Sequence, residues 1–454
     1  MKRWIIASTL IALLLAATNA WSGPWAQFRG PNRNGQSSET GLLKSWPGDG
    51  PKQLWISEVD MGVGYSSPAV TKDAIYVTGV FDADGYVIAL DLDGKSKWKT
   101  KYGREYTKNF LSARTTPTVS DGRLYVMSGL GRVVCLDAEK GDEKWAVDTV
   151  KQYGAKQVMW GMAECLLVCD DKVICTPGGA KAAIVALDKN TGKKIWTCSV
   201  KDNLSAYCSP IRIKDDSRDL IVTMLSQYVV GVSTKTGKLL WRYPYSGPHT
   251  VHANSPIYSD GQIYVTCGYN YGGVMLALAA DGATVKKLWS AAKFDTHHGG
   301  AVKIGRRLYG SNWKSNTRGG WMCLDWKTGK ITFQTSWSNK GSIVTAEGLL
   351  YCYTEAGTVA LVKPSPTAWE VLSSFDVIKG SGRFWAHPAI SGGRLYIRRG
   401  EALMAFDIKA PNTPESDLKT AGKQLTPRRR MSGLDRTGRS SGGMSGRATR
   451  RFAR

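Results

Sequence analysis

Residues 75–98 read IYVTGVFDADGYVIALDLDGKSKW, and this stretch decides the fold. An apolar strand, Ile75-Tyr76-Val77, is followed by a short turn and by a second strand that ends in Ala89-Leu90-Asp91. A Gly-Lys pair then precedes a third strand, which carries Trp98. Short apolar runs bounded by Asp, Gly and Lys are typical of hairpins, because Asp accepts backbone N–H bonds and Gly adopts positive φ. The stretch therefore predicts consecutive strands of one antiparallel sheet.

The same unit recurs eight times along the chain. Successive copies begin about 46 residues apart, a spacing that suits a four-stranded propeller blade with short turns. The high counts of glycine (50) and tryptophan (17) come largely from this repeat, and they argue against a coiled coil or a helical bundle. The first strands of the copies start at Ile75, Leu124, Val173, Leu220, Ile263, Leu308, Leu350 and Leu395.

A short apolar segment before each copy predicts the innermost strand of each blade. The eighth copy lacks a strand with Trp, whereas Trp55 has no earlier unit to which it can belong. We expect the N-terminal strand to complete the last blade, so that the ring has no open sheet edge. The sequence thus predicts an all-β, eight-bladed β-propeller of four-stranded antiparallel blades, closed by an N-terminal strand. A seven-bladed ring is the alternative.

The two ends of the chain differ in composition from the repeats. Residues 1–20 combine a basic start, an apolar run and small residues, which is the layout of a secretory signal peptide. The run is shorter than the ~20 residues of a spanning helix, so we expect an exported protein, periplasmic or extracellular, with no transmembrane segment in the mature chain. Residues 21–50 form a lead-in segment, residues 51–409 the propeller, and residues 410–454 a disordered basic tail.

The net charge of +24 is concentrated in part at the C-terminal end. The tail holds eleven basic residues against three acidic ones, and so carries +8. Such a charge can bind an anionic surface, for example lipid headgroups or an envelope polymer, although a tail that is merely solvated has the same composition. An exported protein seldom meets nucleic acid, so no nucleic-acid partner is expected.

Cysteine and tryptophan fall mostly into slots of the repeat. Cys135 and Cys323 stand where other copies have Ala, and Cys175 and Cys352 stand in the slot of Val77, so we interpret all four as small buried apolar residues. Most Trp residues are expected to wedge between blades. Four fall outside the repeating slot and are therefore freer to serve a site: Trp160, Trp313, Trp321 and Trp385.

The repeating Ile-Tyr-Val, Ala-Leu-Asp, Gly-Lys, Trp unit resembles that of the PQQ-like (pyrroloquinoline quinone repeat) β-propeller family over roughly residues 55–408. The segment WAQFRGPNRNG at residues 25–35, followed by GYSSPAV at 64–70, is similar to the start of secreted bacterial PQQ-like repeat proteins. The resemblance implies one of two functions. Quinoprotein alcohol and sugar dehydrogenases of this family bind PQQ and calcium on the propeller axis, whereas the barrel-assembly propeller lipoprotein is a scaffold without a quinone.

The chain departs from both of these patterns. It has no adjacent Cys-Cys pair and none of the long insertions that the dehydrogenases carry, and it has no Cys-x-x-Cys-His site for haem attachment. It also has no lipid-accepting Cys after the apolar run, unlike the lipoprotein. The resemblance is therefore specific for the fold and weak for the function.

All five histidines lie just before predicted inner strands. A propeller brings these loops together at one end of its axis, so we expect a site at the channel mouth. Arg and Lys suit carboxylates, and Trp and Tyr suit stacking on a planar ligand. The candidate cofactor- or ligand-binding residues are Arg114, Trp160, Glu164, Asn254, His298, Arg383, Trp385 and His387, with Tyr65, Tyr207 and Lys340 nearby.

Catalytic and metal-binding candidates are fewer. Glu164, Asn254 and Asp295 can supply oxygen ligands to calcium, which takes six to eight of them. Asp295 is also the candidate for a catalytic base. A zinc site from His252, His298 and His387 is disfavoured, because a propeller spreads these three over three blades. The same polar residues can instead solvate a water-filled channel.

Two functions follow from these patterns. The favoured one is a secreted PQQ-like β-propeller that acts as a binding or scaffold protein in the cell envelope, with an envelope protein or a small ligand at the propeller face. The alternative is a quinoprotein-type oxidoreductase, a PQQ- and calcium-dependent alcohol or sugar dehydrogenase with its site at the channel mouth. The missing dehydrogenase features and the basic tail favour the first, and the sequence leaves open whether PQQ is bound.

Overall fold

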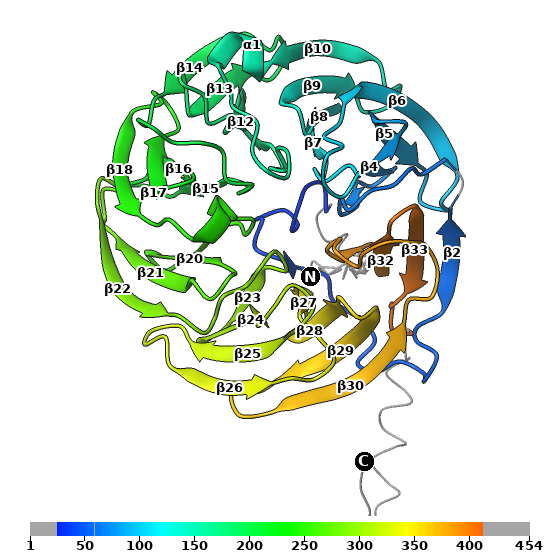
Figure 1. Cartoon of the computed structure of the whole chain (residues 1–454). Coiled ribbons are helices and arrows are strands. Elements are labelled where there is room, and N and C mark those ends of the chain that lie inside the picture. Colours follow the sequence, from blue (N-terminus) through cyan, green and yellow to red (C-terminus); the bar gives the residue numbers. More distant parts are fainter. Residues whose placement is uncertain (1–24, 59, 412–454) are drawn as a thin grey trace, which may run out of the picture. The chain divides into compact units, whose positions relative to one another are not determined.

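Eight sheets surround a central axis in the computed structural model, which describes residues 25–58 and 60–411 (Figure 1). Each sheet contains one blade of four antiparallel strands, and consecutive strands of a blade run from the axis toward the rim. The predicted eight-bladed all-β propeller is confirmed, and the seven-bladed alternative is wrong. The predicted signal peptide and nearly all of the predicted basic tail lie outside the described residues, so both stay predictions.

The first four blades are built from sixteen strands. Blade one has β3 (Ala69–Val70), β4 (Ile75–Phe81), β5 (Asp84–Leu90) and β6 (Ser96–Arg104). Blade two has β7 (Thr118–Ser120), β8 (Arg123–Met127), β9 (Arg132–Asp137) and β10 (Glu143–Asp148), and the short helix α1 (Thr149–Tyr153) follows it. Blade three has β11 (Leu167–Cys169), β12 (Lys172–Cys175), β13 (Ile184–Asp188) and β14 (Lys194–Cys198). Blade four has β15 (Ile211–Lys214), β16 (Asp219–Met224), β17 (Tyr228–Ser233) and β18 (Leu239–Pro244).

The other four blades complete the ring. A 3-10 turn (Pro248–Thr250) leads to blade five, with β19 (Ile257–Ser259), β20 (Gln262–Cys267), β21 (Gly272–Leu278) and β22 (Val285–Ala291). Blade six has β23 (Ala301–Ile304), β24 (Arg307–Trp313), β25 (Gly319–Asp325) and β26 (Ile331–Thr335). Blade seven has β27 (Gly341–Ala346), β28 (Leu349–Thr354), β29 (Thr358–Pro364) and β30 (Trp369–Asp376). Blade eight has β31 (Ala389–Ser391), β32 (Arg394–Arg399), β33 (Ala402–Asp407) and β2 (Gln53–Ser57).

The N-terminal strand closes the ring, as predicted. β2 pairs antiparallel with β33, and Trp55 lies opposite Ala405 in this pairing. β33, the last strand of the sequence repeat, is therefore paired with a strand that precedes it in the chain by more than 300 residues. The closure pairs the outer edge of the last blade and leaves the blade with four strands like the others.

One packing motif repeats between neighbouring blades. Trp55 of blade eight covers the turn of blade one, where its Nε1–H donates to the carbonyl of Leu92 (2.9 Å). Gly94 in that turn has φ +81°, and a Cβ there would lie 2.6 Å from the Trp55 ring. The Gly-Lys turn and the Trp strand of the sequence repeat are thus two halves of one inter-blade contact. The same Trp-on-glycine contacts join Trp98 to Gly141, Trp145 to Gly192, Trp196 to Gly237 and Trp289 to Gly329.

Blade seven replaces its Trp with a residue from the lead-in. In blade seven, Trp369 lies at the start of the outer strand β30, opposite Pro364. The position that Trp occupies in the outer strand of other blades is taken by Ser373, which lies opposite Leu361. The backbone of Trp46 forms hydrogen bonds with the Ser373 hydroxyl, and its ring packs on Tyr351. Trp321, which the sequence marked as free to serve a site, is wholly buried and stacks on Trp369 at 5.3 Å.

The lead-in segment crosses the middle of the ring (Figure 1). Its strand β1 (Gln36–Ser37) pairs with β27, the inner strand of blade seven. Two buried arginines fasten it further: Arg29 donates to the carbonyl oxygen of Ala301 in blade six, and Arg33 donates to that of Cys165 before blade three. The segment therefore contacts blades on opposite sides of the ring and crosses the axis.

Cysteine follows the prediction made from the repeat. All nine cysteines are free and buried, including the four that occupy apolar slots. Burial raises the pKa of the thiols of Cys175 and Cys352 well above the usual range, which fits an apolar packing role. Among the described residues, neither α1 nor the 3-10 turn is long and apolar enough to cross a membrane.

Candidate functional site

A cavity of about 310 Å³ lies on the axis, where the loops before the inner strands meet. Phe28 of the lead-in contributes to its wall, so the segment that crosses the axis also bounds the cavity. Each of the eight blades contributes as well. The lining residues include Tyr65 and Ser67, Arg114 and Thr116, Trp160 and Cys165, Tyr207 and Ser209, Val251 and Tyr269, His297 and His298, Glu355, and Trp385 and His387, in blade order.

Aromatic rings form a large part of this wall. Trp385 is their centre: its ring lies 4.9 Å from Tyr65, 5.1 Å from Phe110 and 5.4 Å from His298, all in edge-to-face contact. On the opposite side Trp160 meets Tyr207 at 6.1 Å. Edge-to-face pairs hold each ring in place and leave ring faces available to a ligand. The cavity is therefore a preformed apolar site with a few polar groups.

The lead-in sets the state of one histidine on this wall. Arg29 Nη1 lies 3.2 Å from Nδ1 of His387, and the Nε2 atom of His387 lies 2.8 Å from the carbonyl oxygen of His298. A guanidinium can only donate, so Nδ1 accepts and Nε2 carries the proton that is donated to His298. Burial, reinforced by the Arg29 charge, lowers the pKa of His387 well below its usual value. His387 is thus a neutral, fixed link between the lead-in and blade six.

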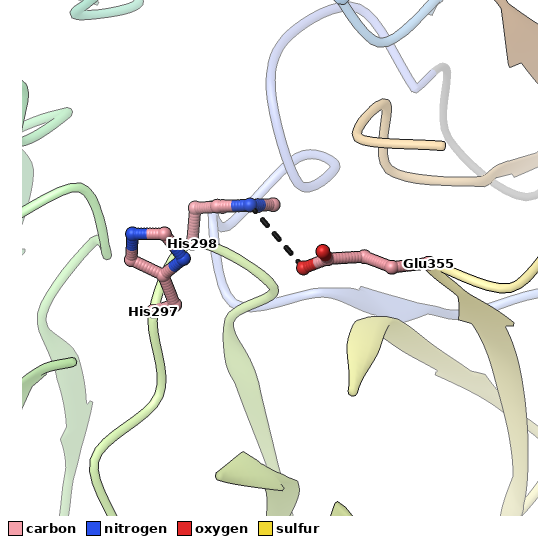
Figure 2. A group of neighbouring side chains, drawn as sticks. All are labelled: His297, His298 and Glu355. Carbon is pink, nitrogen blue, oxygen red and sulfur yellow. Dashed lines mark ion pairs between the residues drawn. The ribbon is translucent and has the colours of Figure 1, made fainter. Parts of the chain in front are cut away.

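Three side chains on this wall form a compact polar cluster, shown in Figure 2. His297 and His298 come from the loop before β23, and Glu355 follows β28 in the next blade. One ligand atom of each lies within 4.8 Å of the others. Lys340, a buried residue, places Nζ 2.6 Å from Oε2 of Glu355. Burial lowers the pKa of both histidines to about 3, so both imidazoles are neutral at pH 7.

The structure brings six of the candidate binding residues to the cavity. Tyr65 and Tyr207 join them there, whereas Lys340 reaches the cluster through Glu355. Arg114 is anchored by the backbone carbonyls of its own loop, including that of Phe110 (2.8 Å). The six candidates at the cavity are Arg114, Trp160, His298, Arg383, Trp385 and His387.

Glu164, Asn254 and Asp295 are not among the cavity-lining residues. Glu164 accepts hydrogen bonds from the backbone N–H and the hydroxyl of Thr176 within blade three. Asp295 accepts from the backbone N–H groups of Asn270 and Trp313. Burial raises the pKa of both carboxyl groups to about 7, although these hydrogen bonds oppose the shift.

Asn254 uses both ends of its amide inside the protein. Its Nδ2 donates to the carbonyl oxygens of Thr296 (2.7 Å) and His297 (3.2 Å), and its Oδ1 accepts from the backbone N–H of Gly300 (3.0 Å). Asn254 therefore holds the loop that carries the two histidines. This position gives it a structural role next to the cavity.

These contacts decide whether the residues of the cavity fit the calcium ion that the resemblance to quinoprotein dehydrogenases implies. Calcium requires six to eight oxygen ligands. The three predicted oxygen donors are engaged by neighbouring backbone, and among the described lining residues Glu355 is the sole carboxylate, already paired with Lys340. The residues present do not fit a calcium site. The arginines and aromatic rings do fit a planar anion.

Sequence reasoning missed Glu355, Phe28 and Arg29. Glu355 sits in an ordinary hairpin turn, Thr354-Glu355-Ala356-Gly357, with nothing to distinguish it from other turn carboxylates. Arg29 and Phe28 belong to the lead-in, which has no repeat to indicate where it lies. His297 was noted before its inner strand, but its pairing with Glu355 depends on the contact between blades six and seven.

Comparisons with known proteins agree with this fold. The model of the family described as "Outer membrane protein assembly factor BamB" matches residues 83–335. A quinohemoprotein alcohol dehydrogenase, ADH-IIG of Pseudomonas putida, is 29% identical over 31% of this chain and 20% of its own length. The outer membrane protein assembly factor BamB of Kangiella koreensis is 26% identical over 45% of this chain and 49% of its own length. The chain thus spans a fifth to a half of these two relatives.

Solved structures give the same picture. BamB from Moraxella catarrhalis has a TM-score of 0.57 at 16% identity, covering 79% of this chain and 99% of its own. A europium-containing methanol dehydrogenase has a TM-score of 0.63 at 15% identity, covering 83% of this chain and 90% of its own. At such identities the likeness is one of fold.

Proposed function

The chain belongs to the family described as outer membrane protein assembly factor BamB, and from this premise we propose that it is a binding and scaffold propeller of the cell envelope. Its binding site is the axial cavity, and its partner is a segment of another envelope protein that inserts apolar side chains there. The observation that carries the proposal is one cavity to which all eight blades contribute and to which seven Phe, Tyr and Trp side chains give apolar surface.

The rim of the cavity supports a protein partner. Phe110 before blade two and Met159 before blade three are 48% and 55% exposed, although both are apolar. The two loops are tied together, because Tyr106 Oη and Asn109 Nδ2 both donate to the carbonyl oxygen of Met159. Exposed apolar side chains on fastened loops are typical of interaction sites. The rim thus adds apolar area to the aromatic wall.

Site-specific photo-crosslinking in intact cells tests this proposal. A photoreactive amino acid replaces Phe110 at the rim or, as the matched control, Leu288 on the outer strand β22, which is similarly exposed at 45%. We expect an adduct with an envelope protein from position 110 and none from position 288. Equal crosslinking from both positions, or none from either, would contradict the proposal.

A quinoprotein-type oxidoreductase is the second candidate. It is favoured by Arg114, Arg383, Trp160 and Trp385, which surround one cavity and fit a planar anion such as PQQ. The test adds PQQ with and without Ca²⁺ to purified protein and follows cofactor absorbance and dye reduction with alcohols or sugars. Robust turnover that Trp385→Ala abolishes would replace the scaffold proposal, whereas binding without turnover would leave it in place.

A further inference from the structure

The cluster of His297, His298 and Glu355 has the composition of a transition-metal site. Two imidazoles and one carboxylate suit zinc and the neighbouring divalent metals, whereas calcium prefers oxygen alone. The three groups come from adjacent blades and lie close together (Figure 2), and all three line the cavity. Glu355 directly follows β28, and two glycines separate His298 from the inner strand β23, so both positions lie close to hydrogen-bonded strands.

One nitrogen in the cluster lacks a hydrogen-bond partner among the described residues. Nε2 of His298 is buried and makes no hydrogen bond to any residue within 25–58 or 60–411, although a buried polar atom is normally satisfied. It lies 3.4 Å from Oε1 of Glu355, which is longer than an N–H···O hydrogen bond. Two ligands of a tetrahedral zinc ion with bonds of about 2.0–2.1 Å are separated by about 3.4 Å. The spacing of this pair therefore matches that of two ligands of one ion.

Neighbouring residues orient the three ligands. Oε2 of Glu355 is taken by Lys340, which leaves Oε1 directed to the histidines. The hydroxyl of Tyr269 lies 3.1 Å from Nε2 of His297, and His387 donates to the backbone of His298. Metal ligands are normally held by such outer contacts, which fix ring orientation. The cluster thus has both ligands and support.

We propose that His297, His298 and Glu355 bind a divalent first-row transition metal, Zn²⁺ being the probe of choice. Three protein ligands leave a fourth position, which opens to the cavity and accepts water or an anionic ligand. The buried ammonium of Lys340 repels the added cation, and an anion in the fourth position offsets that repulsion. The proposal goes beyond the scaffold function and does not depend on which partner enters the cavity.

Metal titration of the full chain tests the proposal. Protein freed of metal with EDTA is titrated with Zn²⁺ by calorimetry and with Co²⁺ by visible absorption. We expect one Zn²⁺ per chain and the intense visible bands of tetrahedral Co²⁺. His298→Ala and the near-isosteric Glu355→Gln should each weaken Zn²⁺ binding at least about tenfold. Thermal unfolding of each variant, measured alongside, verifies that the propeller is intact.

His249→Ala is the matched control. Its ring contacts Trp160 and Tyr269 beside the same cavity but lies outside the cluster. We expect this variant to bind Zn²⁺ as the wild type does. Failure of the folded wild type to bind either metal would overturn the proposal. Binding that survives both ligand substitutions, or that His249→Ala weakens equally, would overturn it too.

Discussion

At the residue scale, His252 shows how one histidine of the five serves the fold instead of the cavity. It is fully buried, its Nδ1 lies 3.0 Å from the Leu225 carbonyl oxygen, and its Nε2 accepts the backbone N–H of Gly247. The proton therefore resides on Nδ1, and a second proton would displace the bond to Gly247. Burial lowers the pKa of His252 to about 4.

This pKa predicts a loss of stability in mild acid. The unfolded chain takes up the proton on His252 near pH 6.5, whereas the folded protein takes it up only near pH 4. The neutral buried imidazole therefore makes its full contribution to the free energy of unfolding above pH 6.5, and this contribution declines as pH falls toward 4. The expected loss at pH 4 is about 3 kcal/mol. Urea unfolding of the wild type and of His252→Gln at pH 7, 5.5 and 4 measures it.

The comparison between the two proteins isolates His252 from the other histidines. His297, His298 and His387 also have lowered pKa values and add to the same trend in both proteins. We expect the free energy of unfolding to fall less steeply with acid in His252→Gln. Parallel pH profiles would show that the buried imidazole is not the titrating group.

At the element scale, the hairpin turn of one blade and the outer strand of the previous blade form one packing unit. Gly94 has φ +81°, and a Cβ added to it would lie 2.6 Å from the Trp55 ring, whereas Gly122 has φ +72° and open space around it. Gly94→Ala should therefore cost both backbone strain and overpacking, and Gly122→Ala strain alone. We expect Gly94→Ala to be more destabilising by about 1–3 kcal/mol.

Chemical denaturation of the two glycine variants checks this expectation. Both substitutions change one turn residue with positive φ by one methyl group, so their difference reports the inter-blade contact. Equal losses of stability would mean that the Trp ring shifts without cost. In that case the Gly-Trp pairing would be a consequence of turn geometry and not a contact that holds blades together.

At the scale of the whole molecule, β2 joins the two ends of the ring. Trp55 in β2 and Trp98 in β6 occupy the same register slot and are both half-buried, but only Trp55 lies on the closing strand. Each Trp→Ala change should cost about 2–4 kcal/mol. We expect Trp55→Ala in addition to open blade eight locally, because a terminal strand can detach while the rest of the ring stays folded.

Hydrogen exchange measured by mass spectrometry distinguishes the two effects. Trp55→Ala should speed exchange in β2 and β33 well beyond the change that Trp98→Ala produces in β5 and β6. Equal local effects would show that the closing strand is held as firmly as a strand inside a blade. If both variants exchanged only through unfolding of the whole ring, the closing strand would likewise not open by itself, and the expectation would be wrong.

The blades were predictable because the repeat is local. Each copy contains its own turns and strands, so about 46 residues are enough to specify one blade, and Trp55 without a unit indicated the closure. The same logic placed Arg114, Trp160, Arg383 and Trp385 at the axis, since any loop before an inner strand ends there. For Glu164 this logic did not suffice, because its side chain turns into its own blade to meet Thr176.

The sequence by itself determined much of the architecture of this protein: the repeat of eight units, the strand that closes the ring, the burial of the four cysteines in apolar slots and the end of the axis where polar residues gather. Only the tertiary structure decided what that end can do. It laid the lead-in across the axis, and it placed Glu355 beside His297 and His298. The physical reason is the separation along the chain of the residues that make contact. A hairpin forms between neighbours in the sequence, whereas this cluster exists only where two blades meet.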